Sequence, residues 1–134
     1  MAEGMVVKEL LTDSMVNAGA ALTKKLEENG LPVTTALWLF NPELGEWQLV
    51  FGSPDVGTKG PRNVYFRILE AIDQLGESVS AAPFSVITVR PTTDDLVRHL
   101  KSAIPTGPEL KQVRVKRAYA DGRYIEDALI YRAS

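Results

Sequence analysis

The segment GSPDVGTKGPR, residues 52–62, has residue types and a spacing that could bind phosphate. Gly52 and Gly57 are spaced like the two glycines of the phosphate-binding pattern G-x-x-x-x-G-K-[ST], but Thr58 precedes Lys59 where that pattern has the reverse order. The lysine of the pattern reaches the phosphates and the hydroxyl after it holds magnesium, so the transposition disturbs both contacts. The sequence therefore argues against a nucleotide hydrolase.

The same segment keeps the features of a simpler anion site. Lys59, Arg62 and Asn63 surround a predicted helix start near Pro61, where unpaired N–H groups and the helix dipole favour a negative group. The segment is therefore either an anion-binding loop at 52–63, with these three residues as its ligands, or a solvated turn in which glycine and proline only shape the chain.

Two further groups have side chains capable of acid–base chemistry. His99, the single histidine, follows Asp94 and Asp95 on a predicted helix, but no serine or cysteine is tied to it by the sequence. We expect a boundary histidine, and two carboxylates that favour the helix start. Glu126 and Asp127 are adjacent on a predicted strand, where successive side chains point to opposite faces. We therefore expect cross-strand ion pairs and no catalytic carboxylate pair.

Basic and aromatic side chains alternate near the C-terminus, as they do in β-ribbons that bind nucleic acid. The residues concerned are Arg114, Lys116, Arg117, Tyr119, Arg123 and Tyr124. A chain with a net charge of −2 has less positive charge than such a groove normally carries. We expect the two tyrosines to stack across the strands, and nucleic acid is not the expected partner.

Composition limits the classes of protein to which the chain can belong. Its 134 residues suit one domain spanning residues 1–134. The absence of cysteine excludes disulfides and thiolate sites, and one histidine argues against an imidazole metal site, so no metal or cofactor is expected. The N-terminus lacks a signal-peptide pattern, and no apolar run approaches the ~20 residues of a membrane span. A cytoplasmic protein without a membrane partner is expected.

Hydrophobic spacing predicts three helices. Apolar residues three and four positions apart place them at residues 7–28, 61–75 and 92–104. Asn29-Gly30 and Gly76 are typical helix stops for the first two. The third is expected to start at Thr92, because Thr92 and Asp95 have the spacing of a capping box.

Aromatic and β-branched residues predict five strands. VTTALWLF (33–40) and EWQLVFG (46–52) flank a turn and should pair with Phe40 opposite Trp47 and Leu37 opposite Val50. Both faces of this hairpin are apolar, so we expect it at the centre of the sheet with cover on each side. FSVITVRP (84–91) is expected to form a short strand.

The last two strands are predicted to form a hairpin with the preferred turn Asp121-Gly122 at its tip. Counting outward from this turn places Arg117 opposite Glu126 and Lys116 opposite Asp127, as exposed ion pairs. The element order is therefore α-β-β-α-β-α-β-β. This order predicts an α+β fold with three helices packed on a mixed, mostly antiparallel five-stranded sheet.

The blocks ALWLFNPELGEWQLVFGSP, GPRNVYFRI and YIEDALIYR follow one another at a definite spacing. In that arrangement they resemble a family of small uncharacterised bacterial proteins, with a likeness over most of the chain. The resemblance implies a stand-alone bacterial protein. It implies no activity and transfers no site residue.

The leading functional expectation is a non-enzymatic binding or interaction module that associates with itself or with another protein. No residue set meets the geometric minimum for a nucleophile, a base and an oxyanion donor, and the apolar hairpin face needs a covering surface. The alternative is an enzyme or ligand-binding protein that acts on a phosphate-bearing small molecule at the loop 52–63.

Overall fold

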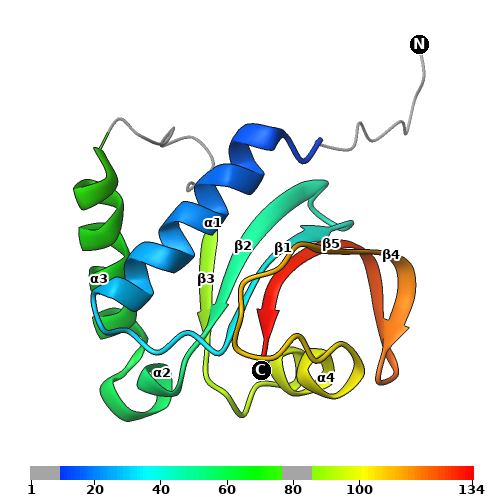
Figure 1. Cartoon of the computed structure of the whole chain (residues 1–134). Coiled ribbons are helices and arrows are strands. Elements are labelled where there is room, and N and C mark those ends of the chain that lie inside the picture. The colour runs from blue at the N-terminus through cyan, green and yellow to red at the C-terminus, as the bar shows by residue number, and fades with distance from the viewer. Residues whose placement is uncertain (1–9, 77–85) are drawn as a thin grey trace.

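A five-stranded sheet with helices on both faces forms the framework of the protein (Figure 1). The computed structural model describes residues 10–76 and 86–134. Its elements are α1 Asp13–Glu28, β1 Thr35–Asn41, β2 Glu46–Gly52, α2 Pro54–Lys59, α3 Pro61–Leu75, β3 Ile87–Arg90, α4 Asp95–Ala103, β4 Val113–Ala120 and β5 Arg123–Ala133. The strand order is β3-β2-β1-β5-β4, with only β2 and β3 parallel. The predicted α+β fold and element order are confirmed, and α2 is an additional, fourth helix within the described residues.

The N-terminal helix α1 is shorter than predicted. It begins at Asp13, after Thr12, whose hydroxyl accepts a 3.1 Å hydrogen bond from the N–H of Met15. Leu10 lies before this cap and is exposed, and Val7 lies outside the described residues. The helix cannot extend back beyond Thr12, because an N-cap residue has an extended backbone conformation.

The β1–β2 hairpin has the predicted register, with Phe40 opposite Trp47 and Leu37 opposite Val50. Strand β1 is central in the sheet, between β2 and β5. The two faces of the hairpin belong to two separate cores. The predicted cover on both sides is therefore confirmed for the buried residues of the hairpin.

The larger core lies between the sheet and the helices α1 and α3. It contains the aromatic side chains Trp38, Trp47, Phe51 and Tyr131. The Tyr131 hydroxyl donates a hydrogen bond to the carbonyl of Val16, and the Trp38 indole N–H contacts that hydroxyl at 3.1 Å. These bonds satisfy the polar atoms of large buried rings, which otherwise cost stability.

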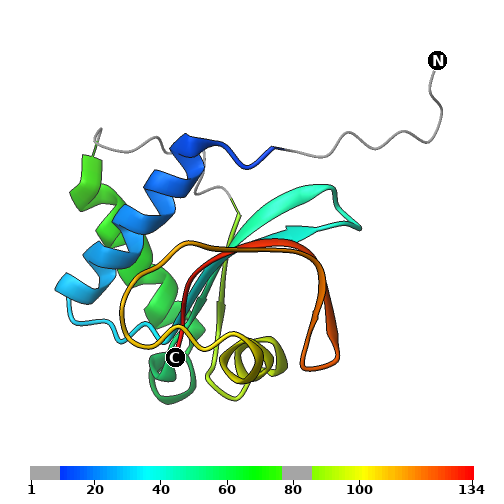
Figure 2. The ribbon, with the colours of Figure 1, turned by 45° about the vertical axis from the view of Figure 1, so that its right-hand side comes forward.

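The opposite face of the sheet is covered by α4 and by the bent β4–β5 hairpin. Leu96 and Leu100 of α4 pack with Leu37 and Val50. The hairpin bends out of the sheet so that its tip comes down beside α4 (Figures 1 and 2). Helix α4 is capped by Asp94 rather than by the predicted Thr92, since the Asp94 carboxylate accepts from the N–H groups of the first turn.

The edge strand β3 is shorter than the predicted strand at 84–91. It pairs with β2 from Ile87 to Arg90, and residues 84 and 85 lie outside the described residues. In the part of the chain that the structure describes, no helix is long and apolar enough to cross a membrane.

The final hairpin has Asp121 and Gly122 at its tip, both with positive φ, as a two-residue turn of this kind requires. Lys116 is the register partner of Asp127, as predicted. The expectation that Asp127 forms an exposed pair is wrong. Its side chain is fully buried and takes a two-pronged contact from Arg114, at 2.7 and 2.9 Å.

Candidate functional site: a groove beside the bent hairpin

A groove of about 320 Å³ lies between the β1–β2 hairpin and the bent β4–β5 hairpin. The floor of the groove belongs to the same face of the sheet that α4 covers, but lies nearer the β1–β2 turn. Leu37 and Val50 are buried, whereas the next pair along the same face, Leu39 and Gln48, is half-buried and lines the groove. The groove exists because the hairpin bends over a part of the sheet that the nine-residue helix α4 does not reach.

Arg90, the last residue of β3, lines one side of the groove. Its guanidinium lies 3.2 Å from the carboxylate of Asp94, which also caps α4. The Arg90 Nε–H is buried and has no acceptor within the described part of the chain. The contact with Asp94 thus orients the Arg90 side chain, but it does not satisfy all of the N–H donors of the guanidinium group.

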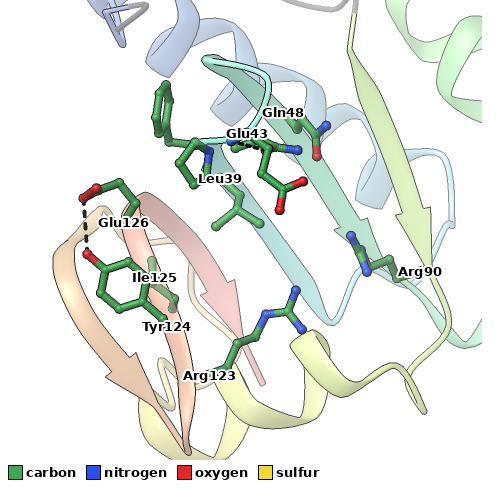
Figure 3. A pocket seen from close by; sticks show the side chains of 11 residues that line it. Leu39, Glu43, Gln48, Arg90, Arg123, Tyr124, Ile125 and Glu126 are labelled. Carbon is green, nitrogen blue, oxygen red and sulfur yellow. Dashed lines mark hydrogen bonds between the residues drawn. The ribbon is translucent and has the colours of Figure 1, made fainter. Parts of the chain in front are cut away.

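Arg123 lines the opposite side, as the first residue of β5 after the hairpin tip. Its backbone pairs with Ala120, and its side chain forms no hydrogen bond and no ion pair with other residues that the structure describes. Figure 3 shows the guanidinium groups of Arg90 and Arg123 extending toward the same opening from opposite sides. Two such groups supply planar forks of N–H donors, which match the oxygens of a carboxylate or a phosphate.

Acidic and amide groups also line the groove. The Glu43 carboxylate faces the opening from the β1–β2 turn (Figure 3), where the Asn41 side chain accepts from the N–H of Glu43 at 3.0 Å. Glu126 is 3.7 Å from Arg117, so its charge is partly offset. The groove therefore has a cationic side, an acidic rim and, in Leu39 and the buried Ile125, an apolar floor.

The predicted loop at 52–63 has a different structure from the one expected. Residues Pro54–Lys59 form α2, and the Ser53 hydroxyl caps its start by accepting from the N–H of Asp55. The Thr58 hydroxyl donates to the Pro54 carbonyl at 3.3 Å. Thr58 thus lies inside a helix, and its hydroxyl is engaged by the backbone.

The three predicted anion ligands lie in two helices. Lys59 is the last residue of α2, and Arg62 and Asn63 lie in the first turn of α3. The Lys59 ammonium is 3.5 Å from the Asp55 carboxylate, which also pairs with Arg67 at 3.2 Å. Arg62 and Asn63 are exposed, and no side chain caps the start of α3. An anion at these three residues stays a prediction, with Lys59 already held by a carboxylate.

The residues around His99 are arranged as a helix start, in agreement with the sequence. Asp94 caps α4, and a hydrogen bond from Arg98 lowers the pKa of Asp95, helped by the charge of that guanidinium. The charges of His99 and Arg123 contribute less to this pKa. His99 itself is half-buried, with an Nδ1 atom that has no partner in the described part of the chain.

Four of the basic and aromatic residues of the last hairpin have structural partners. Tyr119 and Tyr124 are register partners with ring centroids 5.3 Å apart, which confirms the predicted pair. Arg114 and Arg117 bind Asp127 and Glu126. Lys116 and Arg123 form no ion pair with residues that the structure describes, and of these two Arg123 lines the groove.

A second hollow of about 230 Å³ adjoins the C-terminus and is lined by Arg132 and Glu27. Arg132 is almost fully buried and donates to Glu27 and to the carbonyl of Val33. Its guanidinium therefore joins α1, the following turn and β5, which is a structural role. Within residues 10–76 and 86–134, no group of three or more acidic or histidine side chains could hold a metal ion.

Comparisons of the chain with protein-family models, with curated proteins and with solved structures find no match. The chemistry of the groove is therefore inferred from its own residues.

Proposed function

We propose that the protein is a non-enzymatic binding protein whose groove takes a small organic anion. The observation that supports this most directly is the pair of guanidinium groups, Arg90 and Arg123, that face one opening from two different strands. The anion is a carboxylate or a phosphate, and the apolar floor at Leu39 and Ile125 favours a ligand with a short hydrocarbon part.

The lining supports binding rather than chemistry. It contains no serine, threonine, cysteine, lysine or histidine, the side chains that most often act as nucleophiles or bases. Of its carboxylates, Glu43 faces the opening from the β1–β2 turn, and Glu126 lies on the far side of Tyr124 (Figure 3). A ligand anchored by its anionic group at the arginines could therefore present an amine or hydroxyl group to Glu43.

Calorimetric titration with hexanoate and hexyl phosphate, each compared with its neutral counterpart hexanamide or hexanol, tests the proposal. The anions should bind more tightly than the neutral compounds. Arg123→Gln should weaken anion binding about tenfold or more, because a hydrogen bond to a charged group contributes about 1.5–3 kcal/mol. The matched control Lys24→Gln removes an exposed charge on α1 and should bind like the parent.

A ligand at 100 times its dissociation constant should also stabilise the fold by about 2.7 kcal/mol, which a thermal melt detects. The proposal is wrong if neither anion binds saturably, or if Arg123→Gln binds both anions as tightly as the parent does.

A further inference from the structure

The outer side of α3 carries an unpartnered apolar pair. Phe66 and Leu69 are 66% and 65% exposed, although both are large hydrophobic side chains. At 3.6 residues per turn they lie opposite the buried stripe that includes Val64 and Ile68. Figure 1 shows α3 at the edge of the molecule, with one side toward the sheet and the other facing outward.

Charges of opposite sign flank this pair on the same side of the helix. Arg62 lies four residues before Phe66, and Asp73 lies four residues after Leu69. Both are exposed, and their side chains form no ion pair or hydrogen bond with residues that the structure describes. The stripe therefore reads cation, aromatic, aliphatic, anion along α3.

This order is complementary to itself. When two copies of α3 pack antiparallel about a two-fold axis between residues 67 and 68, Phe66 meets the partner's Leu69. In the same arrangement Arg62 meets the partner's Asp73, and symmetry repeats each contact. We propose that this surface, the α3 stripe of Arg62, Phe66, Leu69 and Asp73, binds a second copy of the chain.

The stripe covers about 16 Å of helix, at 1.5 Å per residue, so the contact between two copies is small. Interfaces below about 1,200 Å² are typical of weak, transient association. We therefore expect a reversible dimer that forms between about 10 μM and about 1 mM chain. The groove lies on the other side of the sheet from α3, so dimer formation and ligand binding are tested separately.

Sedimentation equilibrium of charge-reversal variants over this concentration range tests the proposal. In the antiparallel pair, each reversed residue would meet a like charge on the partner. Arg62→Asp and Asp73→Arg should each weaken the dimer about tenfold, since each creates two like-charge contacts. The double variant Arg62→Asp/Asp73→Arg should restore the parent affinity. Lys24→Asp, a charge reversal at an exposed position of α1, is the control and should leave the affinity unchanged.

Leu69→Ser should also shift the protein to monomer without lowering its melting temperature by more than a few degrees, because the side chain is exposed. A parent chain that stays monomeric up to about 1 mM would overturn the proposal. So would a double variant that associates no better than either single variant, because that result excludes the antiparallel register.

Discussion

The buried carboxylate of Asp127 binds Arg114, whose own side chain is 41% exposed. Arg114 binds both carboxylate oxygens, and a hydrogen bond with Asp127 raises the pKa of this guanidinium above its ordinary value. The guanidinium carbon also lies 5.5 Å from the centre of the Trp47 ring, an additional stacking contact. Arg114 therefore supplies two hydrogen bonds to a carboxylate that the fold removes from water.

Arg114→Gln should consequently destabilise the protein by about 2–3 kcal/mol. This is below the 3–5 kcal/mol of a fully buried pair, because water still screens Arg114. Lys116→Gln, two positions along the same strand, removes an exposed charge and should cost less than about 0.5 kcal/mol. Urea unfolding of both variants measures the difference. Equal costs would show that Asp127 does not depend on Arg114.

Tyr131 should make the stability of the protein fall at alkaline pH. Burial raises the pKa of its phenol well above the ordinary value of 10.0, and its hydrogen bonds with Trp38 and the backbone offset only part of this shift. A group whose pKa is higher in the folded state stabilises the fold below its unfolded pKa, and this contribution is lost as the pH rises further.

The free energy of unfolding should therefore fall by about 1.4 kcal/mol per pH unit above about pH 10, beyond the change shown by Tyr131→Phe. Urea unfolding of the parent and the variant at pH 8 and at pH 11 measures this difference. The variant should be less stable at pH 8, because it lacks the hydroxyl that binds Val16. Parallel pH profiles of the two proteins would contradict the assignment.

Two helical glycines, Gly19 in α1 and Gly57 in α2, have opposite surroundings. A Cβ atom at Gly19 would lie 2.5 Å from the Tyr131 hydroxyl and 2.7 Å from the Trp38 indole nitrogen, whereas nothing lies within 4 Å of one at Gly57. Alanine ordinarily favours a helix over glycine by about 0.5–1 kcal/mol. The close approach of α1 to the sheet should reverse that preference at Gly19.

Gly57→Ala should accordingly leave the melting temperature unchanged or raise it slightly. Gly19→Ala should destabilise the fold by about 1–3 kcal/mol, because the added methyl group must displace Tyr131 or Trp38. Thermal melts of the two variants decide the sign of each effect. A Gly19→Ala protein as stable as the parent would mean that α1 can move away from the sheet.

The short helix α2 shows why one element was missed from the sequence. Ser53, Pro54 and Gly60 are turn formers, and they predict a loop when considered together. In the structure they are the N-cap, the first residue and the C-cap of a six-residue helix. The same residue types mark turns and helix ends, and six residues are too few for an apolar stripe to distinguish the two.

At the scale of the whole molecule, local patterns predict the strands and their registers but not the groove. Glu43, Arg90 and Arg123 belong to three separate segments, and each of their elements is predictable from alternation or turn type. What brings them together is the bend of the final hairpin, where Arg117 has a φ of 48° and interrupts the ladder. Such a bend depends on twist and packing across the sheet, and the sequence therefore placed Arg123 only in a basic ribbon.

The most direct test of the binding groove is a titration of the parent protein with hexanoate, followed by amide NMR shifts. We predict saturable shifts at Glu43, Gln48, Arg90 and residues 123–126, which line the groove, and their loss in Arg123→Gln. Saturable shifts confined to residues 57–64 would place the anion at the start of α3 and contradict the groove. The absence of any saturable shift would contradict anion binding altogether.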